Sequence, residues 1–326
     1  MANESTRTVL VSLGAGLGIA LTKVGAAAVT GSSAMAAEAS HSVADSASDL
    51  LLFVAQRRSS HPPDEQHPLG YGREAFFWAL LAALGVLVAG VAFSLRAGVA
   101  ELIHPGATSS FAVAYVVLAF STVFDLLSFR QSGGQMITRA RRYDRRVLEE
   151  SRVTSDPTLR AVFVSDLVAV SGDLIAFAAL ALTQITGSST PQGVAAVLIA
   201  LVMIRISLRL IQRSHDFLVG AWVFPAAPAG HAPGDFTQPL RPADEARARD
   251  YLLGVSGVTA VHELLFTFVG PGRVWVVARV GIDDDLRGGQ VEALAREIES
   301  GMRHQSEEIF RIDVVPISEG QVHPTA

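Results

Sequence analysis

Six long apolar segments occupy the first two thirds of the sequence. They lie near residues 8–30, 33–56, 73–103, 110–132, 158–186 and 190–213. A helix needs about 20 apolar residues to cross the hydrocarbon core of a bilayer, and each segment reaches that length. The chain is 50% hydrophobic and 17% charged, which is more apolar than an average soluble domain. The pattern predicts an α-helical membrane protein with six transmembrane helices.

The basic residues between these segments predict how the chain crosses the membrane. The short connections near 30–33, 104–110 and 186–190 contain no Lys or Arg, whereas the connections after the second and fourth segments are rich in Arg. Cytoplasmic loops carry the excess of basic residues, so both termini are expected in the cytoplasm. The N-terminus lacks a basic region followed by a cleavage site, so no signal peptide is expected. We expect a multi-pass protein of the cell (inner) membrane.

Charged residues become dense after residue 241, which indicates a second, water-exposed domain. Residues 243–326 alternate helical and strand-like periodicity in the order α-β-β-α-β, which predicts a small cytosolic α+β domain. The six-helix domain is assigned to residues 1–215. Residues 216–242 are rich in Pro, Gly and Ala, and they are interpreted as a linker.

Composition narrows the chemistry that the chain can perform. The sequence has no cysteine, so any metal must be held by His, Asp or Glu. The isoelectric point near 6.0 does not indicate a nucleic-acid partner. Lys23 is the only lysine in the sequence, which has many arginines and alanines. We interpret this scarcity of lysine as the bias of a G+C-rich genome.

The second apolar segment carries Glu38, His41, Asp45 and Asp49, spaced three, four and four residues apart. Ionisable side chains within a span cost about 2.5–3.5 kcal/mol each on insertion scales, so they usually mark a polar path. Residues i and i+4 lie on one face of a helix. His41 and Asp45 can therefore bind one ion, while Asp45 and Asp49 can bind another or share a proton.

The fifth segment contributes Asp166 and Asp173, seven residues apart on one helical face. In an antiparallel arrangement with the second segment, we expect His41 at the depth of Asp173 and Asp49 at the depth of Asp166. His41, Asp45 and Asp173 would form an outer tier that suits a transition metal. Asp49 and Asp166 would form a tier about 10 Å further toward the cytoplasm.

Several acidic residues have alternative roles that the sequence leaves open. Asp125 in the fourth segment either lines the same path or pairs with Arg96 or Arg205. Glu38 and Asp49 can instead lie near the membrane interface, where a charge costs little. A single aspartate in a span can also cap a helix or pair with an arginine.

Three features together resemble the cation diffusion facilitator family: HSVAD in the second segment, PPDEQHPLGYGRE in the loop that follows, and six spans with a cytosolic α+β tail. HPLGYGREAFFWALLAA and DPTLRAVFVSDLVAVSG resemble the branch that includes the mitochondrial zinc exporter. The resemblance implies a homodimeric, proton-coupled exporter of divalent metal, usually zinc. It also implies alternating access around a site between the second and fifth spans.

The resemblance places the four-ligand site of the family on His41, Asp45, position 169 and Asp173. Position 169 is usually His in the family and is Ala169 in this chain. Asp166, one turn further toward the cytoplasm, matches an acidic position of the exporter-like branch and can compensate for the missing ligand.

The resemblance also identifies two accessory metal sites that are incomplete here. The loop site falls on Asp64, His67 and Tyr71, of which two can bind metal, and we favour a structural turn. In the tail, His262 and Asp313 match zinc positions of some members, but the remaining positions are apolar or basic. We expect the tail to serve mainly as a dimer contact.

The predicted function is divalent metal efflux, with Zn²⁺ first, coupled to proton antiport. The expected partners are the metal, protons, the bilayer and a second copy of the chain, with no cofactor and no nucleic acid. One alternative is the same scaffold transporting Mn²⁺, Fe²⁺ or Co²⁺, which oxygen-rich sites favour. Another is a membrane metal sensor without transport. An enzyme is not expected, since no HExxH-type motif is present.

Overall fold

The computed structural model describes residues 2–106, 108, 110–142, 146–154, 156–220, 242–305 and 309–318. The chain divides into two compact units. The first contains residues 1–60, 74–139 and 157–216, and the second contains residues 61–73, 140–156 and 217–326. Most of the predicted linker, residues 216–242, lies outside the described residues, which exclude 221–241.

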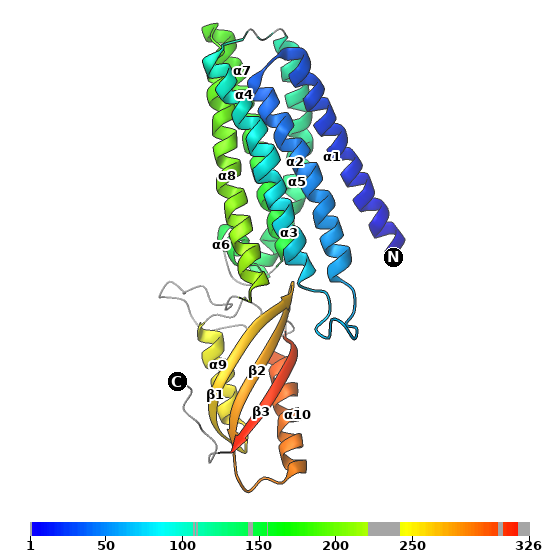
Figure 1. Cartoon of the computed structure of the whole chain (residues 1–326), viewed down its shortest axis with the longest axis vertical. Helices are drawn as coiled ribbons and strands as arrows, with labels where there is room; N and C mark the ends of the chain where they lie inside the picture. The colour runs from blue at the N-terminus through cyan, green and yellow to red at the C-terminus, as the bar shows by residue number, and fades with distance from the viewer. Residues whose placement is uncertain are drawn as a thin grey trace. The chain divides into compact units, whose positions relative to one another are not determined.

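Long helices make up the first unit (Figure 1). In chain order they are α1 (Ala2–Thr30), α2 (Ser33–Ser59), α3 (Glu74–Gly85), the π-helical turn η1 (Val86–Gly90), α4 (Val91–Ile103), α5 (Phe111–Arg142), α7 (Pro157–Thr186) and α8 (Thr190–Leu218). The short helix α6 (Val147–Val153) lies between α5 and α7 in the sequence. The segments α3, η1 and α4 are consecutive and together form one long helical span.

Four of the described helices are long and apolar enough to cross a membrane: Glu74–Ile103, Phe111–Arg141, Pro157–Thr186 and Thr190–Leu218. Gly16–Thr30 of α1 is a shorter apolar helix. The helix α2 covers the predicted second span, and its stripe of polar residues lowers its hydropathy. Helices therefore stand at each predicted span, and the prediction of a helical membrane protein followed by a small α+β domain is confirmed.

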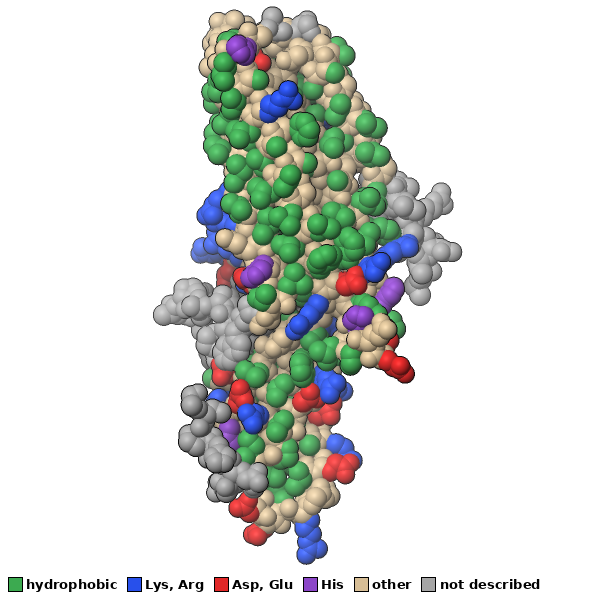
Figure 2. All heavy atoms as spheres, viewed as in Figure 1, with side chains coloured by type: hydrophobic (Ala, Val, Ile, Leu, Met, Phe, Trp, Pro, Cys, Tyr) green, Lys and Arg blue, Asp and Glu red, His purple; other side chains and the backbone are tan. Residues whose placement is uncertain are grey.

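The outer surface of the helices is apolar, as a lipid-facing surface must be. On α5, the side chains of Val116 and Leu127 are 68% and 58% exposed. Figure 2 shows hydrophobic side chains spread over the helices, with few charged ones between them. A water-soluble protein would bury such side chains, so their exposure indicates a surface solvated by lipid.

Close helix packing depends on small residues. A Cβ atom on Gly98 of α4 would lie 2.9 Å from the carbonyl oxygen of Gly193 in α8. On Gly90 it would lie 3.0 Å from the Cβ of Ala44 in α2. Small residues let helix backbones approach in membranes, where burial of apolar surface no longer drives association. These contacts hold α2, α4 and α8 close enough to enclose polar side chains.

Two glycines form the tight turns between neighbouring helices. Gly31 after α1 and Gly187 after α7 have φ of 67° and 69°, the left-handed conformation that ends a helix. The Ser32 hydroxyl then accepts a hydrogen bond from the Met35 amide at 3.2 Å and caps α2. These turns lie at the short connections expected near 30–33 and 186–190.

The second unit contains a three-stranded sheet with two helices. Its elements are α9 (Pro242–Gly254), β1 (Val258–Gly270), β2 (Arg273–Ile282), α10 (Gly288–Gln305) and β3 (Ile309–Ser318). The strand order is β1-β2-β3; β1 and β2 are antiparallel, and β2 and β3 are parallel. The predicted order α-β-β-α-β is confirmed. Because parallel strands need a crossover, α10 connects β2 to β3.

The core of this sheet shows the two-residue period of a strand. Val274, Val276 and Val280 of β2 are buried on one face, together with Phe266 of β1 and Ile298 of α10. The opposite side chains of β2 are less buried. One covered face is what an antiparallel pair with helices on one side requires.

Candidate metal site

The antiparallel pairing of α2 with α7 sets the depth of every polar residue in the bundle. Ser165 of α7 donates a hydrogen bond to the carboxylate of Asp45 on α2. Seven residues away on both helices, Gly172 lies against the Glu38 carboxylate, whose carbon would be 3.1 Å from a Cβ at Gly172. The predicted pairing of His41 with Asp173 is therefore wrong by about one helical turn. It assumed a register that the helix contacts do not adopt.

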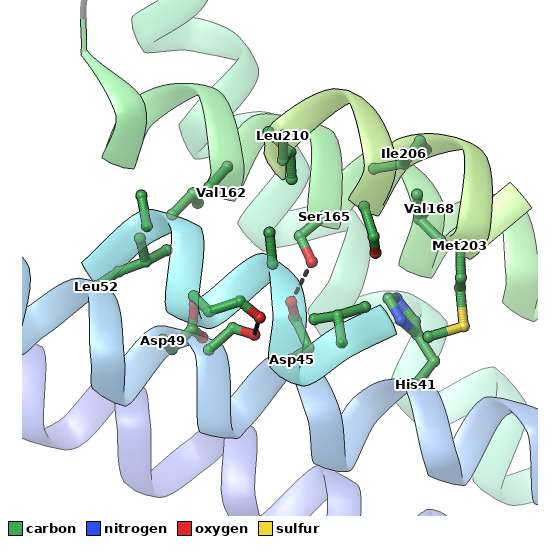
Figure 3. Close-up of a pocket in the computed structure, with 17 residues that line it drawn as sticks. His41, Asp45, Asp49, Leu52, Val162, Ser165, Val168, Met203, Ile206 and Leu210 are labelled. Carbon is green, nitrogen blue, oxygen red and sulfur yellow. Dashed lines mark hydrogen bonds between the residues drawn. The ribbon is translucent and has the colours of Figure 1, made fainter. Parts of the chain in front are cut away.

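A cavity of about 40 Å³ lies between α2, α3, η1, α7 and α8. A cavity needs roughly 10–15 Å³ of such space to hold one water molecule, so this cavity has room for a small ion or a few waters. Its polar lining includes His41, Asp45, Asp49 and Ser165. Figure 3 shows Asp45 facing Ser165, with apolar side chains around them. The labelled apolar residues of the lining are Leu52, Val162, Val168, Met203, Ile206 and Leu210.

His41 is the most unusual side chain of this cavity. It is 2% exposed, and neither ring nitrogen has a hydrogen-bond partner among the described residues. Buried polar groups almost always have a partner, so an unpartnered imidazole indicates a missing ligand. Figure 3 shows the ring beside Val168 and Met203. A neutral imidazole nitrogen in such a place is well suited to bind a metal ion.

The π-helical turn η1 faces this cavity. Val86, its first residue, contributes to the lining together with Ala82 and Ala83 of α3. A π-helical turn widens the helix locally and is frequent at functional sites. The π-helical turn η1 of the third span thus lines the same cavity as His41, Asp45 and Asp49 of α2.

Asp166 does not line the cavity, although its neighbour Ser165 does. Its carboxylate accepts hydrogen bonds from Ser128 at 2.8 Å and from Ser132 at 2.5 Å, both on α5. Successive residues of a helix point about 100° apart, so Ser165 and Asp166 lie on different faces of α7. The carboxylate of Asp166 therefore faces α5, while the Ser165 hydroxyl faces α2.

Asp173 is held in a separate cluster of charges. The Lys23 ammonium of α1 lies 2.7 Å from Asp173, 3.2 Å from Glu38 and 3.3 Å from Asp125. Ser121 and Thr122 of α5 also donate to Asp173, at 3.1 and 3.0 Å. This Lys23 cluster joins α1, α2, α5 and α7 through one ammonium group.

Three sequence-based interpretations change with this cluster. Asp125 pairs with Lys23, so the suggested partners Arg96 and Arg205 were wrong. Glu38 is fully buried and pairs with Lys23, so it is not an exposed charge at the mouth of the bundle. Lys23 was missed as a functional residue. A lone lysine within an apolar span was the available signal, since such charges are rarely accidental.

Three of the five predicted metal ligands line the same cavity. His41, Asp45 and Asp49 line one cavity, while Asp166 and Asp173 contact residues of other helices. Within the part of the chain that the structure describes, no three His, Asp or Glu side chains are close enough to hold one metal ion. The full ligand set stays a prediction.

The loop that precedes α3 is organised by Asp64. Its carboxylate accepts hydrogen bonds from the amides of Gln66 and His67, at 3.0 and 2.7 Å, and from the Tyr71 hydroxyl at 2.6 Å. The Tyr71 hydroxyl, followed by these amides, lowers the pKa of Asp64 below its usual range. These bonds favour the structural turn over an accessory metal site.

The two tail residues also have ordinary surroundings. Asp313 of β3 accepts hydrogen bonds from Trp275 Nε1 at 2.9 Å and from Arg311 Nε at 2.8 Å. His262 lies exposed on β1. Since the Asp313 carboxylate is already bonded to two donors, this sheet gives no support to the zinc positions suggested for the tail.

Apolar helices around a cavity lined by an imidazole and carboxylates are typical of a membrane protein that binds cations. Residues 9–219 match the family described as the cation efflux transmembrane domain, and the chain belongs to this family. It is a family of transporters and not of enzymes. The resemblance to cation diffusion facilitators is thereby confirmed.

Two curated relatives match most of this chain. One is the human "Proton-coupled zinc antiporter SLC30A9, mitochondrial", with 26% identity over 254 residues, which are 78% of this chain and 42% of that protein. The other is "Metal tolerance protein C4" of Arabidopsis thaliana, with 25% identity over 283 residues, 87% of this chain and 58% of that protein. The matched part is thus about half the length of these relatives.

A solved structure of the MamM C-terminal domain is similar to part of this chain. It has 19% sequence identity and a TM-score of 0.22, and the match covers 23% of this chain and 92% of that chain.

Proposed function

We propose that the protein exports divalent metal ions, zinc first, across a membrane in exchange for protons. The observation that carries the proposal is the buried imidazole of His41, with both nitrogens unpartnered among the described residues, beside a cavity that Asp45 and Asp49 also line. Membership of the cation efflux family and the printed name of a zinc antiporter among the relatives support the same ion and the same coupling.

The proposed ion site consists of His41, Asp45 and Asp49. Asp166 and Asp173 would become ligands after the ion has entered and the helices have moved. One nitrogen and several oxygens form a donor set that Zn²⁺ accepts. Asp166 follows Ser165 directly on α7, so a rotation of this helix by about 100° would exchange the two side chains at the cavity. This rotation would place the carboxylate of Asp166 at the position beside Asp45 where the Ser165 hydroxyl now lies.

Proton coupling follows from the ligand types. Imidazole and carboxylate bind a metal ion only when they are deprotonated, so proton uptake at the same groups drives release. The dense placement of these groups on α2 means that each ion leaving the site can be replaced by protons on the same side chains. An antiporter needs this mutual exclusion between its two substrates.

The proposal also covers the membrane in which the protein lies, the side on which its termini lie, and its oligomeric state. We place it in the inner membrane of the cell, with both termini in the cytoplasm, because arginines gather at the C-terminal ends of α2 (Arg57, Arg58) and α5 (Arg139, Arg141, Arg142). We also propose a homodimer in which the α+β domain is a contact between two copies. Lipid would cover the exposed apolar side chains of the helices.

Zinc flux into proteoliposomes tests the proposed function. The wild type should accumulate zinc when a pH gradient is imposed. Asp45→Asn or His41→Ala should reduce the initial rate by at least the roughly 10–100-fold that loss of a residue supporting a metal ligand costs. Asp284→Asn, an exposed carboxylate in the turn after β2, is the matched control and should keep the wild-type rate. A wild type that moves none of Zn²⁺, Mn²⁺, Fe²⁺ and Co²⁺ would overturn the proposal.

A further inference from the structure

In the Lys23 cluster, three carboxylates surround a cation, and this cation is the side chain of Lys23 itself. Lys23 is the only lysine of the protein, and its side chain is completely buried. Its ammonium contacts carboxylates from three different helices: Glu38 of α2, Asp125 of α5 and Asp173 of α7. An ammonium has three donors and no acceptor, so the three carboxylates match its bonding capacity.

The charges of this cluster do not cancel. One ammonium faces three carboxylates, which leaves a formal charge of −2 if all four groups are ionised. Removing charges from water is unfavourable unless further charges or hydrogen bonds compensate. Ser121 and Thr122 add hydroxyl donors to Asp173 alone. The cluster therefore favours the uptake of a further cation or a proton, and Asp173 makes the shortest contact with the ammonium.

The Lys23 cluster and the cavity are neighbours on α2. Glu38 precedes His41 by three residues, which corresponds to about 4.5 Å along the helix axis and nearly the same face. Gly172 brings α7 directly against Glu38, so Asp173 lies at that same level. A divalent ion bound at His41 and Asp45 would thus be about one turn away from a carboxylate that Lys23 already occupies.

From these contacts we propose that Lys23 is a tethered competitor of the transported ion for Asp173. This rests on the proposed function. Without a divalent ion, Lys23 would bind Asp173 through the contact that the structure contains. When a divalent ion enters, Asp173 becomes its ligand, and Lys23 stays with Glu38 and Asp125. When the ion leaves, Lys23 returns to Asp173. Lys23 is a positioning residue, and it limits how tightly the ion is held.

A purely structural role for Lys23 predicts different behaviour. If the ammonium only joins four helices, its loss lowers thermal stability and leaves zinc affinity unchanged or weaker. If it competes, its loss strengthens zinc binding and slows release. Zinc affinity therefore separates the two roles, whereas stability alone does not.

Lys23→Met also adds negative charge, and a charge-matched variant removes this ambiguity. In Lys23→Met with Asp125→Asn, two carboxylates remain without an ammonium, and the formal charge of −2 equals that of the wild type. Any change of zinc affinity in this double variant reports the competitor and not the net charge. Thr22→Ala, whose hydroxyl donates to the Gly18 carbonyl of its own helix, is the control for changes in α1.

The experiment measures the zinc dissociation constant of the purified chain by calorimetry, together with KM and kcat in proteoliposomes. The double variant should bind zinc at least about tenfold more tightly, which corresponds to about 1.4 kcal/mol, with a lower KM and a lower kcat. Thr22→Ala should match the wild type. A double variant with unchanged or weaker zinc binding would refute the competition and leave Lys23 with a purely structural role.

A second measurement keeps the inference falsifiable if Lys23→Met does not fold. Lys23→Arg retains a cation, and its effect on zinc affinity is compared in the wild-type and Asp173→Asn backgrounds. Competition for Asp173 requires that the effect be lost in Asp173→Asn, and equal effects in both backgrounds contradict it. A wild type that moves none of Zn²⁺, Mn²⁺, Fe²⁺ and Co²⁺ refutes the proposed function, whereas zinc transport without this coupling refutes only the competition.

Discussion

The Lys23 ammonium on α1 lies 2.7 Å from the Asp173 carboxylate on α7, and neither side chain is exposed. The two residues are 150 positions apart in the sequence. Their contact withdraws from the cavity one of the carboxylates on which a metal site between the second and fifth spans would depend. The residues of α7 near Asp173, namely Gly172, Val168 and Ala169, are therefore the first to test.

Gly172→Ala tests the close approach of α2 and α7. The added methyl group would collide with Glu38 Oε1 and displace this carboxylate from Lys23. Overpacking of this kind destabilises proteins by about 1–3 kcal/mol, so we expect a lower midpoint of thermal unfolding in detergent. Gly134→Ala is the control, because no atom lies within 4 Å of its Cβ position. Equal midpoints for both variants would refute the packing described for Gly172.

Val168→His and Ala169→His compare two possible positions for an additional zinc ligand. Val168 lines the cavity, whereas Ala169 is not among the lining residues. We therefore expect Val168→His to tighten zinc binding by about tenfold or more, because it adds an imidazole to the ligands that α2 presents to the cavity. Ala169→His should change the dissociation constant much less. Calorimetric titration checks this, and stronger binding by Ala169→His would show that α7 turns when the ion binds.

Zinc should stabilise the folded protein, and a chelator should remove the effect. A ligand at about 100 times its dissociation constant adds about 2.7 kcal/mol of stability when it binds only the folded state. We expect the unfolding midpoint in detergent to rise with zinc and to return to the starting value with EDTA. His41→Ala should abolish most of the rise. A shift of equal size in His41→Ala would place the bound zinc elsewhere.

Asp64→Asn tests whether the loop before α3 contributes to the pH dependence of transport. Because the Tyr71 hydroxyl lowers the pKa of Asp64 below its ordinary value, its ionised form is favoured in the folded loop. Its contribution to loop stability is complete above the unfolded pKa and is lost only as pH falls through the lower, folded value. The flux profile between about pH 5 and 8 should therefore be the same for Asp64→Asn and the wild type. A displaced profile would assign a proton-coupling role to this loop.

Much of the fold was predictable because it depends on local periodicity. The apolar segments, the glycine turns at 31 and 187, and the order α-β-β-α-β all follow from patterns within about 20 residues. The stripe of His41, Asp45 and Asp49 was equally visible, since residues four apart on one helix share a face without help from any other element.

The Lys23 cluster and the register between α2 and α7 could not be obtained in this way. Periodicity identifies the face of a helix but leaves its displacement along a neighbour undetermined. That displacement is set by contacts such as Gly172 against Glu38 and Ser165 against Asp45, which come from distant parts of the chain. The sequence by itself determined that this protein spans a membrane and carries an imidazole with carboxylates inside it. Only the tertiary structure decided that Asp173 binds Lys23 and that Asp166 binds serines of α5, because buried charges take the partners that helix packing brings within reach.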